Sequence, residues 1–116
     1  MQLLGVHHVG INVTDVDASI DFYVDVLGMS RRTDRPDFGI GGAWLDAAGQ
    51  QLHLLQASVP PNNGQHFALW VEDLDGVISE LRDRGVTVSE AMTVGTDRQA
   101  FLNDPDGNGI EIHEVG

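Results

Sequence analysis

The sequence contains no cysteine, so it can form neither a disulfide bond nor a reactive thiolate. Any metal site must therefore use nitrogen and oxygen ligands. Lysine is also absent, and only six arginines oppose 18 acidic residues, giving a formal net charge of −12. Such a chain lacks the basic surface that nucleic acids and anionic membranes require. The acidic surplus favours solubility, and the alternative is a pocket for a cationic ligand.

Long hydrophobic runs are missing as well. No stretch approaches the roughly 18–20 apolar residues of a membrane helix. The opening MQLLGVHHVG has no basic segment ahead of a long apolar one, so we expect no secretory signal and a cytoplasmic protein. A length of 116 residues with 41% hydrophobic residues suits one compact domain, 1–116.

The sequence does contain an internal repeat. VHHVGINVTDVD at 6–17 resembles QHFALWVEDLDG at 65–76, and aligning His8 with His66 sets an offset of 58 positions, half the chain. Because a repeat is meaningful only when many positions share one offset, the further matches decide the matter. They are Val13 with Val71, Asp15 with Asp73, Asp17 with Asp75, Ile20 with Ile78 and Asp25 with Asp83.

Each half predicts the same order of elements. A six-residue alternation of apolar and other residues, starting at His8 and at His66, indicates a half-buried strand. Apolar residues at helical spacing follow, with Asp15 and Asp73 at the N-cap and Gly28 and Gly85 where each helix stops. The Asp-x-Asp pairs therefore indicate capping rather than magnesium binding.

Three further strands are expected in each half, near 29–35, 41–47 and 51–56, then near 86–91, 98–103 and 109–115. ASVPPNNG at 57–64 reads as a linker, which gives module 1 at about 1–58 and module 2 at about 65–116. The fold class is α+β: two βαβββ modules, each with a helix covering one face of its sheet.

Strand alternation places four polar residues on the helix-free faces. His8 and His66 have the parity opposite to their apolar neighbours, and so do His53 in QLHLLQ and Glu111 in GIEIHE, again 58 positions apart. If the modules curl together, these four meet in one cavity. Three imidazoles and a carboxylate suit one divalent ion such as Zn, Ni, Mn or Fe(II).

Other polar and aromatic residues are assigned smaller roles. His7 has the opposite parity to His8, so we expect it to point toward the helix or the strand edge. Possible pocket residues are Asn12, Trp70, Phe101 and, as a wall or an outer contact of the metal site, His113. Arg98 is expected to be solvated, with anion binding as the alternative, and DPDGN at 104–108 reads as a turn.

Three segments together resemble the vicinal oxygen chelate superfamily of glyoxalases, bleomycin-resistance proteins and extradiol dioxygenases. They are HHVGINVTDVDASIDFYVDVLGM at 7–29, HFALWVEDLDGVISELRDRGV at 66–86 and DPDGNGIEIHE at 104–114. The resemblance implies an open, partly closed barrel-like sheet with outer helices, and in short members a homodimer that completes the barrel. It also implies metal ligands at the positions of His8, His53, His66 and Glu111.

The resemblance implies a glyoxalase I-like lyase or isomerase, in which a metal polarises a carbonyl or enediolate oxygen of a small substrate and Glu111 moves the proton. Glyoxalase I enzymes, however, usually carry glutamate where this chain has His53, and a neutral imidazole near a cation is the poorer base. Two alternatives stay open: a metal-free drug-binding protein of the bleomycin-resistance type, and an extradiol ring-cleaving dioxygenase.

Overall fold

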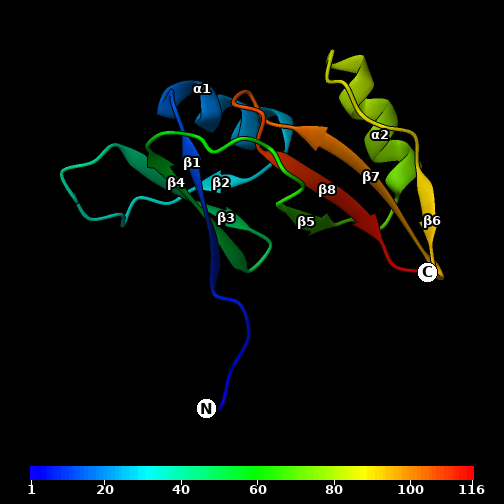
Figure 1. Ribbon diagram of the computed structural model, residues 1–116, viewed down its shortest axis with the longest axis horizontal. Helices are drawn as coiled ribbons and strands as arrows, with labels where there is room; N and C mark the ends of the chain where they lie inside the picture. The colour runs from blue at the N-terminus through cyan, green and yellow to red at the C-terminus, as the bar shows by residue number, and fades with distance from the viewer. The chain divides into compact units, whose positions relative to one another are not determined.

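The computed structural model describes all residues from 1 to 116, and the chain divides into two compact units, Met1–Pro60 and Pro61–Gly116. Each unit is a four-stranded mixed sheet with helical structure between its first and second strands, so the expected pair of βαβββ modules is confirmed (Figure 1). Neither sheet closes on itself. None of the helices is long and apolar enough to cross a membrane.

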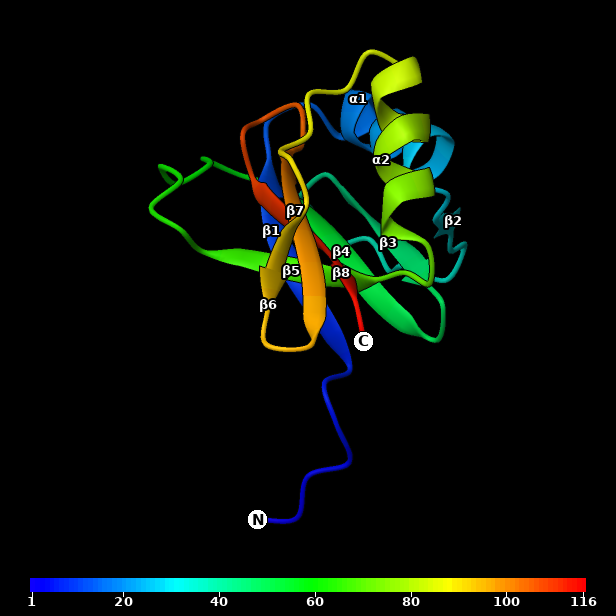
Figure 2. The ribbon, with the colours of Figure 1, turned by 90° about the vertical axis from the view of Figure 1, so that its right-hand side faces the viewer.

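The first unit has the strand order β1-β4-β3-β2, with β1 parallel to β4 and the other pairs antiparallel. Its elements are β1 His8–Val13, α1 Val16–Ile20, the π-helical continuation η1 Asp21–Val26, β2 Ser30–Arg31, β3 Gly42–Ala47 and β4 Gln50–Gln56. The buried side chains of its core include Val13, Tyr23, Leu45, Leu52 and Leu54. Residues 1–7 extend away from β1 without regular structure (Figures 1 and 2).

The second unit repeats this order as β5-β8-β7-β6. Its elements are β5 His66–Trp70, α2 Leu74–Asp83, β6 Met92–Val94, β7 Asp97–Asn103 and β8 Gly109–Glu114. Helix α2 lies along one face of this sheet, where it contacts β7 and β8 (Figure 2). Its buried residues Leu74, Ile78 and Leu81 pack on that side, together with Ala100, Leu102, Ile110 and Ile112 of the strands.

The predicted helix boundaries are confirmed. Asp15 accepts a hydrogen bond from the Ala18 N–H at 3.1 Å, and Asp73 accepts one from the Gly76 N–H at 3.0 Å, as N-caps do. Gly28 and Gly85 follow the helices with φ of 82° and 81°, a left-handed conformation that favours glycine. Both Asp-x-Asp pairs therefore belong to helix starts.

Two strand predictions were wrong in extent. The strand expected at 29–35 covers only Ser30–Arg31, followed by one more backbone hydrogen bond to β3, from the Arg32 N–H to the Trp44 carbonyl at 2.8 Å. The strand expected at 86–91 is absent, and β6 comes later, at Met92–Val94. In place of a ladder, Ser89 makes local contacts with Phe101: its hydroxyl accepts the Phe101 N–H, and its own N–H donates to the Phe101 carbonyl, each at 2.9 Å.

Candidate functional site

The helix-free face of the first sheet carries a stack of three rings. Register places Trp44 of β3 directly opposite His53 of β4, while His8 of β1 lies diagonally across from His53. The His8 and His53 rings lie 3.9 Å apart between centroids and 15° from parallel, and the His53 and Trp44 rings lie 4.5 Å apart and 12° from parallel. His8 and His53 are therefore neighbours within one unit.

The His53 imidazole is held and kept neutral by its surroundings. Its Nε2 lies 2.8 Å from Gln51 Oε1. Partial burial lowers the pKa of His53, and the positive charges of nearby groups, His8 foremost, lower it further. A neutral imidazole keeps a lone pair, which is the form that binds a metal ion.

The corresponding face of the second sheet carries a chain of four polar side chains. His66 Nε2 lies 3.2 Å from Glu111 Oε1, and His113 Nδ1 lies 2.7 Å from Glu111 Oε2. His113 Nε2 in turn lies 2.7 Å from Asp97 Oδ2. Glu111 is only 8% exposed, so these two imidazoles are the partners that a buried carboxylate needs.

At the outer end of this row of side chains, the charges of Asp97 and His113 stabilise each other. Hydrogen bonds to Asp97 first, and to Glu111 second, raise the pKa of His113. The Gly116 N–H, which donates to Asp97 Oδ1 at 2.9 Å, and then His113 lower the pKa of Asp97. His113 is therefore a cationic clamp between two carboxylates and holds Glu111 in one orientation.

His66 has an orientation suited to a metal ligand. Its Nδ1 lies 2.8 Å from the Gly64 carbonyl oxygen, which can only accept a hydrogen bond, so Nδ1 carries a proton. In the neutral ring, Nε2 then presents a lone pair to a Glu111 oxygen that also has only lone pairs. A shared proton or a cation bound by both atoms would satisfy this pair. Their 3.2 Å separation is close to that of two ligands each about 2.0–2.2 Å from one ion.

The four expected ligands are thus found as two pairs, one in each unit: His8 with His53, and His66 with Glu111. No group of three or more His, Asp or Glu side chains lies in the arrangement of a metal site. The donor chemistry and the fixed tautomer of His66 fit a divalent ion, whereas the stacked rings of His8 and His53 do not converge on one point.

The remaining candidate residues have varied surroundings. Asn12 donates to the Ser58 carbonyl at 2.9 Å, and Trp70 is 78% exposed at the end of β5. Phe101 meets the His66 ring edge to face at 5.4 Å, so it lies on the helix-free side. His7 precedes β1, where strand alternation no longer applies, and its Nδ1 lies 2.9 Å from that of His8.

Sequence reasoning missed two residues of these clusters, Trp44 and Asp97. Both could have been found from hairpin register, because Trp44 faces His53, and Asp97 is two residues from Gln99, which faces His113. Arg98, which was expected to be solvated, is 36% exposed and also pairs with acidic side chains. Its guanidinium forms two hydrogen bonds with Asp75, at 2.8 and 3.1 Å, and lies 3.6 Å from Glu114.

Comparison with known proteins agrees with this architecture. Residues 5–112 match the model of the Glyoxalase/Bleomycin resistance protein/Dioxygenase superfamily. A Synechocystis sp. protein named "Probable lactoylglutathione lyase" is 34% identical, covering 90% of this chain and 91% of its own.

Two solved structures share the fold. A glyoxalase family protein from Bacillus anthracis superposes with a TM-score of 0.91 at 23% identity, over 100% of this chain and 98% of its own. TnmS3, an antibiotic binding protein from Streptomyces sp. CB03234, gives 0.82 at 26% identity, over 100% and 99%. The chain belongs to the glyoxalase/bleomycin resistance protein/dioxygenase superfamily.

Proposed function

We propose that the protein is a metal-dependent lyase or isomerase of the glyoxalase type that acts on a small oxygenated molecule. The observation that carries this proposal is the pairing of His66 with Glu111, in which the Gly64 carbonyl holds the proton on His66 Nδ1 and Nε2 lies 3.2 Å from Glu111 Oε1. Metal-ligating histidines commonly donate their second ring N–H to a backbone carbonyl in this way.

His66 and Glu111 would hold the ion, and His8 and His53 stay predicted ligands on the strength of the sequence repeat. A divalent ion bound there would act as a Lewis acid toward a carbonyl or enediolate oxygen. Glu111 is the single carboxylate among the four residues, and we assign it the transfer of a proton at the carbon beside that oxygen. His113 holds the second oxygen of Glu111 and keeps the carboxylate oriented.

Metal analysis of protein purified without an affinity tag tests the proposal. We expect about one divalent ion per protein chain. The identity of the metal would distinguish an iron(II) enzyme from a zinc or nickel enzyme. Loss of a neighbouring partner of a ligand costs about 10–100-fold in metal affinity, so His66→Ala and Glu111→Gln should cost more. Glu80→Gln, on the exposed side of α2, should retain full metal content. Wild-type protein that binds no divalent ion would refute the enzyme assignment.

His53→Ala measures how far the likeness to glyoxalase I extends. If His53 is a ligand, the variant loses metal while remaining folded, because Leu52 and Leu54 supply the packing of β4. If it retains metal like the Glu80→Gln control, the ligand set reduces to His8, His66 and Glu111, the two-histidine, one-carboxylate arrangement.

A second candidate function, metal-free binding of a drug, is favoured by the ring stack of the first module. His8, His53 and Trp44 offer a flat surface, and the likeness to the antibiotic binding protein TnmS3 points the same way. In this reading the imidazoles contact the ligand through their faces. Saturable binding of an aromatic antibiotic by chelator-treated protein, abolished in Trp44→Ala, would support it.

A further inference from the structure

The arginines of this protein fall into two groups. In a chain with a net charge of −12, an arginine would be expected to find a carboxylate, and four of the six do so within 4.0 Å. Arg31 and Arg35 form no such ion pair. Both line one pocket of the first unit, with a volume of about 890 Å³, formed by the β2–β3 loop and β3.

A second pocket provides an internal comparison. It lies in the second unit, has a volume of about 490 Å³, and also contains two arginines, Arg82 and Arg98. Both are neutralised by carboxylates that line the same pocket, Glu90 at 3.1 Å and Asp75 at 2.8 Å. Arginines in a pocket therefore need not be unpaired in this protein, and the pocket of the first unit differs in leaving two positive charges without a counter-ion.

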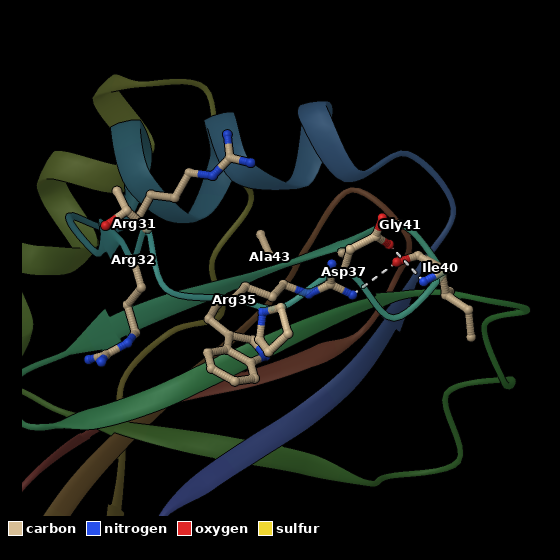
Figure 3. Close-up of a pocket in the computed structure, with 12 residues that line it drawn as sticks. Arg31, Arg32, Arg35, Asp37, Ile40, Gly41 and Ala43 are labelled. Atoms are coloured by element: carbon tan, nitrogen blue, oxygen red, sulfur yellow. Dashed lines mark hydrogen bonds between the residues drawn. The ribbon is translucent and has the colours of Figure 1, made fainter.

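Arg35 is already fixed in position. Its Nη2 donates to the Ile40 carbonyl at 3.0 Å (Figure 3). Its guanidinium carbon lies 5.1 Å from the centre of the Phe38 ring. Gly42 gives it room, because a Cβ there would lie 2.7 Å from Nη2. One hydrogen bond leaves several of the five guanidinium N–H groups free, and an oriented group loses little entropy when it binds.

The other charged residues of the pocket have distinguishable roles. Arg32 is bound to Asp34 and Asp46 at 2.8 and 2.9 Å, so its charge is neutralised. Arg31 and Arg32 point to opposite sides of β2 in Figure 3, so the Arg31 guanidinium lies apart from that of Arg35. Asp37 is the one carboxylate in the lining, and its Oδ1 accepts the Gly39 N–H at 2.8 Å.

We infer that this pocket binds an oxyanion, a carboxylate or phosphate group of a small ligand, through the free N–H groups of Arg35. Arg31, the second unpaired charge of the lining, adds attraction at longer range. Trp44 also lines the pocket and stacks on His53, so the bound group would lie next to the ring stack of the first unit. The inference does not require a metal, and under the proposed function it makes the substrate an anion. It opposes the alternative of a cationic ligand.

The test uses two probes that share a ring and differ in charge, phenyl phosphate and phenyltrimethylammonium. In a Trp70→Phe background, Trp44 is the single tryptophan and reports binding by its fluorescence. At constant ionic strength we expect saturable quenching by phenyl phosphate and none by the cation. The result should be the same with and without a chelator, which separates this site from the proposed metal centre.

Four variants locate the site. Arg35→Gln should weaken phenyl phosphate binding by about tenfold or more, as loss of a charge-assisted contact does. Arg31→Gln removes no side-chain hydrogen bond or ion pair and should weaken phenyl phosphate binding by a few-fold, most at low salt. Asp37→Asn keeps the acceptor for Gly39 and should tighten binding. Arg84→Gln, at the C-cap of α2 in the second unit, is the matched control and should change nothing.

Three results would overturn the inference: no saturable quenching of the wild type, equal binding of the cationic probe, or unchanged affinity in both Arg35→Gln and Arg31→Gln. Because the Arg31 side chain forms no hydrogen bond or ion pair, the second variant remains informative even if Arg35→Gln disturbs the loop.

Discussion

At the scale of single residues, strand alternation predicted which side of the sheet a side chain occupies, which composition cannot do. The parity of His8, His53, His66 and Glu111 followed from their apolar neighbours, and the structure places all four on the helix-free faces. What alternation cannot supply is the partner across the sheet. Asp97 and Trp44 depend on hairpin register, which is set by the turns and by the exact strand ends.

The Asp97–His113 pair leads to a prediction about Glu111. His113→Ala removes the contact to Glu111 Oε2 and leaves a buried carboxylate free to rotate, so metal affinity should fall by about 10–100-fold. His113→Asn can still donate to Glu111 and should recover part of the loss. Isothermal titration of chelator-treated protein with zinc measures both.

The control for this prediction is thermal unfolding of the same metal-free proteins. A purely structural role would lower the melting temperature of His113→Ala without a separate loss of affinity in the folded protein. Equal zinc affinity in wild type and His113→Ala would contradict a role for His113 in positioning Glu111.

At the scale of elements, caps were predictable and short strands were not. Asp15 and Asp73 act through neighbours within three residues, so the local sequence contains the whole signal. The shift of β6 to Met92–Val94 depends instead on where the Ser89 hydroxyl meets β7, a contact 12 residues away in sequence. The β2–β3 loop likewise takes its form from Arg35, Asp37 and two glycines rather than from a strand pattern.

The tie between α2 and β7 should make stability depend on pH. The hydrogen bond from Arg98 lowers the pKa of Asp75, so this carboxylate stabilises the fold above the ordinary aspartate value of about 3.9. That contribution is lost as the pH falls through the lowered value. The urea midpoint of wild type should therefore exceed that of Asp75→Asn at neutral pH, and the difference should shrink below about pH 4.

Asp83→Asn is the matched control at the other end of α2. Asp83 pairs with no arginine and lies at the negative end of the helix dipole, so its neutralisation should raise stability slightly at neutral pH. A gap between wild type and Asp75→Asn that stayed constant down to acid pH would show that the ion pair with Arg98 contributes nothing.

At the scale of the whole molecule, the open edges of the two sheets matter most. The repeat predicted two modules, and each module leaves its first strand, β1 or β5, at the edge of its own sheet. Unpaired strand edges attract further strands. The sequence predicts the two modules but not the assembly. An unpaired strand edge indicates that another strand pairs with it, but it does not identify the protein chain that supplies this strand.

We predict that the protein is a homodimer in which these edges are covered. Trp70 of edge strand β5, 78% exposed, is the most exposed large hydrophobic side chain on any strand, and burying such a ring contributes strongly to an interface. Light scattering at micromolar concentration should give the dimer mass for the wild type. Trp70→Arg should shift the population toward monomer, because a charge buried there lacks a partner. Ser79→Arg adds the same charge on the exposed side of α2 and should remain dimeric. A wild-type protein of monomer mass would contradict the prediction, and a Trp70→Arg dimer as stable as the wild type would place the interface away from β5.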